Sequence, residues 1–253
     1  MKEQSETIGP PSALLLALEG RAFLELGAYF AATPLLRLAP KGDGHPVMVL
    51  PGLGATDFST RPLRAFLRGR GYGTHGWAMG RNDARPGMMS GLLARIRALH
   101  ERYDAKLSLI GWSLGGLYAR ELAKEASSLV RQVITLASPF TGPPTASNAA
   151  RAYELLTGRP AGGEPELRER LRQTPPVPTT AIYTKSDGIV AWQCCVETPG
   201  ARVENIEIHS SHIGLGHHPL TLYAIADRLA QPEREWKAFD RSGVRRFLYR
   251  DPR

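Results

Sequence analysis

Residues 107–116 read Leu-Ser-Leu-Ile-Gly-Trp-Ser-Leu-Gly-Gly, and this stretch decides the fold. The apolar run 107–110, stopped by Gly111, predicts a buried β-strand that ends in a turn. The run 117–124 predicts a helix. Ser113 would therefore lie in a turn between a strand and a helix, where glycines two residues before and after it let the two elements cross closely. A serine on such a turn points out over the carboxyl edge of a sheet. A glycine-rich turn with a capping serine is the less favoured interpretation.

The same alternation of strand and helix continues on both sides of this stretch. Short apolar or alternating runs bounded by turn residues predict strands, and longer runs with apolar residues at helical spacing predict helices. The predicted strands are 46–50, 73–79, 107–110, 133–137, 179–184 and 203–209, and the predicted helices are 60–70, 87–103, 117–124 and 220–229. This alternation favours an α/β fold, with a mostly parallel central sheet covered by helices on both faces.

The composition is that of a globular protein with one main domain. Of 253 residues, 42% are hydrophobic and 22% are charged, which excludes a disordered or fibrous chain. The net charge is +8, but the basic residues are scattered and interleaved with Glu, so we expect an arginine-biased solvated surface and no nucleic-acid partner. Cys194 and Cys195 are adjacent, which favours inert buried thiols over a disulfide framework or a four-cysteine zinc site. No apolar run is long enough to predict a membrane-spanning helix.

We expect a core domain over residues 45–232, a helical segment before it (1–44) and a basic tail after it (233–253). A helix should begin after Ser12, and Pro34 should end or kink it. Its apolar residues at roughly helical spacing are Leu14, Leu18, Phe23, Leu26 and Phe30. A helical pair packed on the domain, on or near the active site, is favoured over an amphipathic segment at a lipid interface. Acidic residues near the start and the lack of a convincing cleavage site argue against an export signal, so a cytoplasmic protein is expected.

One segment interrupts the alternation of strands and helices. Residues 138–178 are rich in proline and contain short helical stretches near 148–156 and 165–171. A long insertion in a compact domain is often a lid or wall of a functional site, and an inert surface excursion is the equally weighted alternative.

A serine hydroxyl becomes a useful nucleophile only beside a base, and the base needs an orienting acid. On a fold of this kind the chain order is serine, acid, histidine. Asp187 directly follows the predicted strand 179–184 and would face the same sheet edge as Ser113. A plain turn before Gly188 is its alternative role, and Glu197 is the second choice of acid.

Four histidines crowd the stretch after the last predicted strand. His212 begins a loop there and is our choice of base, with His217 second; His209 and His218 are the others. Such crowding also raises the hypothesis of a metal site, but no HExxH motif or cluster of acidic ligands accompanies it, so neither metal nor cofactor is expected.

Three further side chains have two interpretations each. Asn82 would line a pocket or brace a catalytic loop, although a plain turn is favoured. Trp112 and Trp192 flank the candidate catalytic residues and would either wall the pocket or pack in the core.

Taken with their order, these motifs resemble the α/β-hydrolase superfamily, and within it the small bacterial triacylglycerol lipases and related deacylases. Residues 211–215 (Ser-His-Ile-Gly-Leu) are similar to the catalytic-histidine loop of those lipases, and residues 186–190 (Ser-Asp-Gly-Ile-Val) to their acid loop. Residues 51–54 (Pro-Gly-Leu-Gly) resemble their oxyanion loop, although many members have His where this chain has Pro51. The resemblance covers about residues 45–230, so the N-terminal segment and the basic tail lie outside it.

The resemblance implies a serine-dependent carboxylic-ester hydrolase that works through an acyl-enzyme on Ser113. It implies a catalytic triad of Ser113, Asp187 and His212, and an oxyanion hole made by the backbone N–H groups of Leu53 and Leu114. The expected substrate is a small-molecule or lipid acyl ester, with contact at a lipid surface as a further hypothesis. An acyltransferase with the same triad, and a silent scaffold that binds a ligand or partner, are the alternative functions.

Overall fold

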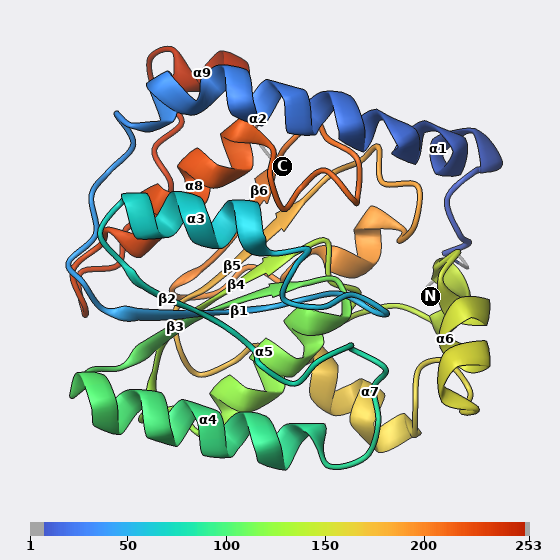
Figure 1. Ribbon diagram of the computed structural model, residues 1–253. Helices are drawn as coiled ribbons and strands as arrows, with labels where there is room; N and C mark the ends of the chain where they lie inside the picture. Colours follow the sequence, from blue (N-terminus) through green and yellow to red (C-terminus); the bar gives the residue numbers. More distant parts are fainter. Residues whose placement is uncertain (1–7, 251–253) are drawn as a thin grey trace.

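The computed structural model describes residues 8–250, which form a central sheet with helices on both faces (Figure 1). All six strands are parallel, in the order β2-β1-β3-β4-β5-β6. The strands are β1 (Pro46–Leu50), β2 (Gly73–Gly76), β3 (Leu107–Trp112), β4 (Val130–Leu136), β5 (Thr179–Tyr183) and β6 (Val203–Glu207). The α/β fold with a parallel sheet is thus confirmed. Four strands are almost wholly buried, because helices cover both faces of the sheet, and the edge strands β2 and β6 are partly exposed.

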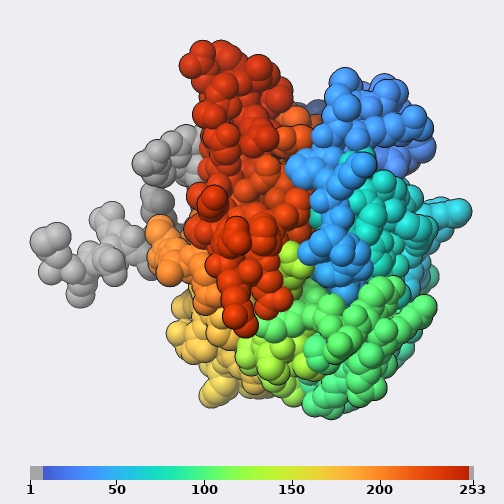
Figure 2. Space-filling model, turned by 90° about the vertical axis from the view of Figure 1, so that its left-hand side faces the viewer, coloured from blue at the N-terminus to red at the C-terminus, as the bar shows by residue number. Residues whose placement is uncertain are grey.

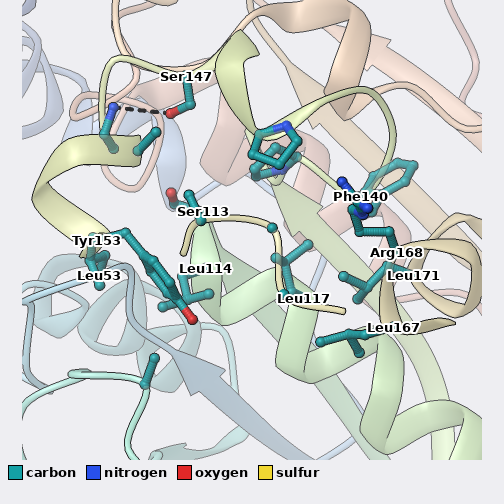
Figure 3. A pocket seen from close by; sticks show the side chains of 18 of the residues that line it. Leu53, Ser113, Leu114, Leu117, Phe140, Ser147, Tyr153, Leu167, Arg168 and Leu171 are labelled. Atoms are coloured by element: carbon teal, nitrogen blue, oxygen red, sulfur yellow. Dashed lines mark hydrogen bonds between the residues drawn. The ribbon is translucent and has the colours of Figure 1, made fainter. Parts of the chain in front are cut away.

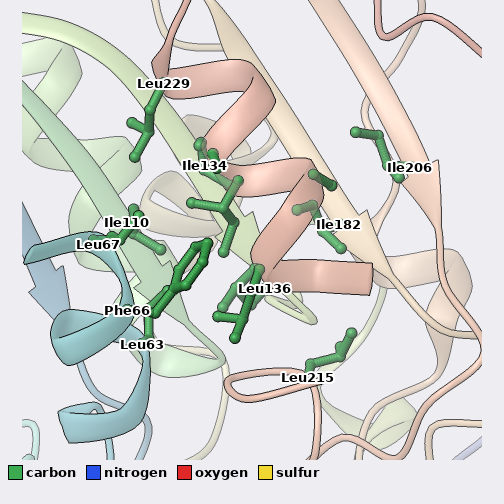
Figure 4. Close-up of a cluster of buried hydrophobic side chains, with 14 of the residues drawn as sticks. Leu63, Phe66, Leu67, Ile110, Ile134, Leu136, Ile182, Ile206, Leu215 and Leu229 are labelled. Atoms are coloured by element: carbon green, nitrogen blue, oxygen red, sulfur yellow. The ribbon is translucent and has the colours of Figure 1, made fainter. Parts of the chain in front are cut away.

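The helices divide between the two faces and produce two hydrophobic cores. On one face α3 (Arg61–Gly69) and α8 (Pro219–Leu229) pack on the sheet around residues such as Phe66, Ile134 and Leu136 (Figure 4). On the other face α4 (Met88–Tyr103) and α5 (Leu114–Glu125) pack through Leu92 and Leu122, among others. This packing holds the carboxyl ends of the strands in fixed positions along one edge.

The predicted elements agree with the structure to within a few residues. β2 is the clearest difference, because it ends at Gly76 and not at residue 79. The backbone N–H groups of Trp77 and Ala78 leave the sheet and donate to the Asp57 carboxylate at 2.9 and 3.0 Å. The helix predicted over 117–124 begins earlier, at Leu114, directly after Ser113.

The N-terminal segment forms a pair of helices joined by a short turn, in line with the favoured helical pair. It consists of α1 (Ala13–Ala17), a 3₁₀ turn η1 (Leu18–Arg21) and α2 (Ala22–Leu36). Pro34 lies inside α2, which ends two residues later at Leu36, close to the predicted end. The two helices meet at the 3₁₀ turn η1, where the side chain of Glu19 is buried in the protein. Ser12 caps α1 as predicted, by accepting the N–H of Leu15 at 3.3 Å.

The proline-rich segment forms a 3₁₀ turn, η2 (Pro144–Ala146), and two short helices, α6 (Ala150–Thr157) and α7 (Pro165–Arg172). A further 3₁₀ turn, η3 (Trp192–Cys195), lies between β5 and β6. Near the C-terminus, α9 (Arg245–Leu248) follows a loop. The loop and α9 are anchored by Phe239 and Tyr249, which are buried in the core under α8.

Candidate active site

Ser113 occupies a strained turn between β3 and α5. Its φ of 52° and ψ of −121° lie in a region that non-glycine residues avoid, which is the geometry that directs a serine out of a sheet. Glycines make the turn possible: a Cβ on Gly111 would fall on Gly116, and a Cβ on Gly115 would fall on the carbonyl oxygens of Leu50 and Pro51. The predicted strand–turn–helix is therefore present, and Ser113 is partly exposed at its tip.

Asp187 and His212 form a buried hydrogen-bonded pair at the same edge of the sheet. Asp187 follows β5 and His212 follows β6, and His212 Nδ1–H donates to Asp187 Oδ2 at 2.7 Å. The other carboxylate oxygen, Oδ1, accepts the N–H groups of Ile189 and Val190 at 2.8 and 2.7 Å. Because a carboxylate can only accept, this contact puts the proton on Nδ1 and leaves Nε2 free to accept one.

The histidine loop (residues 208–217) lies directly against the serine turn. Trp112, the residue before Ser113, donates its indole N–H to the backbone carbonyl of His212 at 3.1 Å. A Cβ on Gly216 would collide with the Trp112 ring. Trp112 thus joins the two loops rather than walling the cavity. Ser113 Oγ itself makes no hydrogen bond within residues 8–250.

Opposing effects act on the protonation of His212. Burial lowers the pKa of its imidazole, but the charge of Asp187, the hydrogen bond to Asp187 and the charge of Glu19 together raise the pKa above the ordinary value of 6.5. The imidazolium is therefore stabilised at this position.

The other candidate acid and bases are engaged elsewhere. Glu197 is ion-paired with Arg120 and accepts the hydroxyl of Thr174 at 2.9 Å, so it is not the partner of His212. His217 contacts the carbonyl of Ala22 through Nε2 at 3.0 Å. His209 is exposed, and His218 caps α8.

The loop after β1 brings backbone donors close to Ser113. A Cβ on Gly52 would lie 3.3 Å from the Cβ of Ser113, so the two turns touch. The N–H groups of Leu53 and Leu114 donate no hydrogen bond to any described residue. Asn82 braces this loop, because its side-chain N–H donates to Pro51 O at 2.8 Å and its backbone carbonyl accepts the N–H of Gly54 at 2.7 Å. The plain turn that the sequence favours is therefore wrong for Asn82, and the alternative, a residue that braces a loop, is correct.

A largely apolar cavity of about 400 Å³ opens beside Ser113. Figure 3 shows Leu114 and Leu117 near the serine, with Tyr153 from α6 close to Leu53 and Leu114, and Leu167 from α7 close to Leu117. Phe140 and Leu171 continue the wall. The insertion 138–178 therefore lines the cavity. Trp192 stands outside the lining and stacks on Tyr183 at a ring-centroid distance of 5.7 Å.

Sequence reasoning missed three polar side chains of the N-terminal segment that hold the loops after β5 and β6. Glu19 accepts three backbone N–H groups: those of Gly188 at 2.8 Å, His212 at 3.0 Å and Ile213 at 2.9 Å. One carboxylate thus binds both the acid loop (residues 184–190) and the histidine loop.

Arg21 and Glu25 extend the same contact. Arg21 Nη2 donates to the carbonyls of Ser186 and Ser210, both at 2.8 Å, and Glu25 accepts the N–H of Ser211 at 2.9 Å and its hydroxyl. We call Glu19, Arg21 and Glu25 the polar clasp. Two loop glycines allow the close approach: a Cβ on Gly188 would meet the backbone of Leu15, and one on Gly214 would meet Glu25.

Cys194 and Cys195 are buried and unpaired, as predicted, and burial raises the pKa of Cys194 to about 11. Within residues 8–250 no group of three or more His, Cys, Asp or Glu side chains is arranged to hold a metal ion. In the same range, every helix is too short or too polar to traverse a bilayer.

No family model matches the chain, and no curated protein matches it in sequence. Solved structures do match. Aspergillus fumigatus lipase B superposes with a TM-score of 0.59 at 16% identity, over 76% of this chain, which spans only 53% of that lipase. The monoacylglycerol lipase of Paleococcus ferrophilus gives 0.52 at 16% identity, over 75% of this chain and 96% of that one. The pyrethroid hydrolase PytH gives 0.53 at 20% identity, over 75% and 99%. At these identities the likeness concerns the fold. From its parallel sheet, its serine turn and these likenesses, the chain has the α/β-hydrolase fold.

Proposed function

We propose that this protein is a serine-dependent carboxylic-ester hydrolase in which Ser113, His212 and Asp187 form the catalytic triad. The observation that carries the proposal is the buried 2.7 Å hydrogen bond between His212 and Asp187, on a loop that Trp112 joins to the serine turn. The lipase and hydrolase neighbours support a hydrolytic reaction.

In the proposed reaction Ser113 Oγ attacks the ester carbonyl while His212 Nε2 takes its proton. Asp187 keeps the imidazole in the required tautomer and stabilises the imidazolium. The backbone N–H groups of Leu53 and Leu114 donate to the oxyanion; losing such a donor typically costs about 10² to 10³ in rate. His212 then gives its proton to the leaving alcohol, and a water molecule activated by His212 releases the acid from the acyl-enzyme.

The cavity indicates the class of acyl group. Its wall is formed mostly by apolar side chains, with Arg85, Glu121, Arg159 and Arg168 as the charged residues of the lining, and its volume is within the range of small-molecule sites. We therefore expect an ester of a hydrophobic acyl group, and the acyl chain would lie between Ser113 and the helices of the insertion.

A fluorophosphonate probe and a series of p-nitrophenyl esters, from acetate to palmitate, test this proposal. Ser113 should be labelled, Ser113→Ala should not, and the labelled protein should lose esterase activity. Hydrolysis should be faster for longer acyl groups than for acetate. If the native protein is neither labelled nor active, the silent scaffold is correct; if a transfer product dominates when an alcohol is added, the acyltransferase is correct.

The pH dependence of kcat/KM follows from His212. The imidazole must be neutral to accept the proton of Ser113, so activity should rise with pH through its pKa. Because Asp187 and Glu19 raise that pKa, the midpoint of the acid limb should lie above 6.5. In Asp187→Asn the residual activity should have its midpoint at lower pH. Stopped-flow or steady-state profiles measure both, and a wild-type midpoint clearly below 6.5 would contradict the assignment.

A further inference from the structure

The N-terminal helices are inverted relative to an ordinary surface helix. Between Ala13 and Leu35 every exposed residue is apolar or glycine, while Glu19 is buried and the side chains of Arg21 and Glu25 are turned toward the catalytic loops. Phe23 is 81% exposed and Phe30 66%. The polar face therefore binds the protein, and the apolar face meets the surroundings. The surfaces of soluble monomeric proteins rarely carry such a long apolar stripe unless the stripe binds a partner.

The further residues of this stripe are large side chains. Together with Phe23 and Phe30 they form what we call the apolar ridge: Leu14, Leu16, Leu18, Leu24, Leu35 and Leu38. At about 1.5 Å per residue the ridge is roughly 35 Å long, which suits a helix lying in the plane of a bilayer surface. Both α1 and α2 lie outside the segment that resembles known lipases.

The C-terminal helix α9 adds to the same side of the molecule. Figure 1 shows α9 beside α2, and Figure 2 shows the red C-terminal segment and the blue N-terminal segment next to each other on one outer side. Exposed Val244, Phe247 and Leu248 of this segment continue the apolar character. This segment contacts the domain through Tyr249 and through Arg245, which donates to the Tyr223 hydroxyl at 2.6 Å, so the three exposed apolar side chains lie outside that contact.

Basic side chains border the apolar residues. Arg37 and Lys41 follow α2, and Arg246 and Arg250 are exposed on and after α9. In residues 236–250, Asp240 is the exposed acidic residue, and Lys237, Arg246 and Arg250 are exposed basic residues. The whole chain has a net charge of +8. Apolar side chains that insert between lipids, flanked by cations that meet phosphate groups, match the surface of an anionic membrane.

We propose that the apolar ridge and α9 dock this protein peripherally on an anionic lipid membrane. A membrane is favoured over a second copy of the chain because a fluid lipid surface covers a projecting helix without a complementary groove, and because bordering arginines would repel their copies across a two-fold interface. The proposal does not depend on catalysis.

Co-sedimentation with vesicles tests it, on full-length Ser113→Ala protein so that no lipid is hydrolysed. The protein should sediment with vesicles of phosphatidylcholine mixed with phosphatidylglycerol, and far less with pure phosphatidylcholine. Phe23→Ser/Phe30→Ser should weaken this binding about thirtyfold, since two aromatic insertions are lost. The matched control is Phe58→Ser/Leu155→Ser, which removes side chains that are 76% and 88% exposed elsewhere and should bind as wild type.

A second pair of variants tests the charge contribution. Arg37→Gln/Arg246→Gln should weaken binding to the anionic vesicles about tenfold, whereas Arg97→Gln/Arg102→Gln, on α4 at the opposite face of the sheet, should not. Equal effects of the two arginine pairs, or equal binding by the ridge variant and its control, would overturn the proposal. So would a dimer in sedimentation velocity that the ridge substitutions dissociate, because the ridge would then join two copies.

Discussion

His212→Ala should lower kcat/KM for ester hydrolysis by about 10⁴ to 10⁶-fold, while His217→Ala should retain activity within about tenfold of wild type. The two histidines are close in sequence and both are buried, but only His212 contacts Asp187. His217 instead bonds to the carbonyl of Ala22 and helps to hold α2. The pair therefore separates loss of the base from loss of a buried imidazole.

The measurements are initial rates with a p-nitrophenyl ester, corrected for the folded fraction from thermal melts. Asp187→Asn should lower kcat about 10⁴-fold without a comparable change in KM, because the imidazole loses its tautomer and its counter-charge. Activity that survives in His212→Ala and disappears in His217→Ala would give the role of base to His217 and refute the triad that we propose.

The parts of this fold that could be predicted are those encoded locally. The serine turn was predictable because strand, glycines and helix are contiguous in sequence, and Gly111 and Gly115 leave room for the strand and the helix to cross at Ser113. Asp187 and His212 were predictable because parallel strands place the loops that follow them at one edge.

The orientation of the N-terminal helices could not be predicted in this way. Periodicity identifies an apolar side of a helix and assigns it to the core. Here the polar side of the segment faces the protein, because the N–H groups of Gly188, His212 and Ile213 need an acceptor. Glu19 supplies it, although it is 169 to 194 residues away in the sequence. The only signals in the sequence were the charged residues inside an apolar stretch and the glycines Gly188 and Gly214 in the acid and histidine loops. Neither signal predicts which residue contacts which.

Asn82 shows the same difficulty on a smaller scale. In sequence it resembles a turn residue between Arg81 and Asp83, and its bonds to the loop after β1 appear only once β1 and β2 lie side by side. The walls of the cavity are similar, since Tyr153 and Leu167 reach it from two helices whose docking the sequence does not specify.

Glu19→Gln should lower kcat about 10²-fold with little change in KM. In the wild type, both carboxylate oxygens of Glu19 accept backbone N–H groups. An amide keeps only one acceptor oxygen, and its NH₂ group would face an N–H donor that the other oxygen accepts in the wild type. His212 and the acid loop should shift as a result, and a displacement of about 1 Å at a catalytic group costs on the order of 10² in rate. Glu19 touches no reacting atom, so its expected role is to position the two loops.

A stability defect alone would not produce this pattern, and two readouts separate the cases. Glu204→Gln is the matched control: Glu204 is also buried, accepts the N–H of Phe239 at 2.8 Å and pairs with Arg228 at 2.7 Å, away from the catalytic loops. Both variants should melt at lower temperature, but only Glu19→Gln should lose kcat per folded molecule. It should also move the acid limb of kcat/KM to lower pH, because removal of the Glu19 charge lowers the pKa of His212. A Glu19→Gln enzyme with wild-type kcat and an unmoved acid limb would reduce the polar clasp to a packing contact.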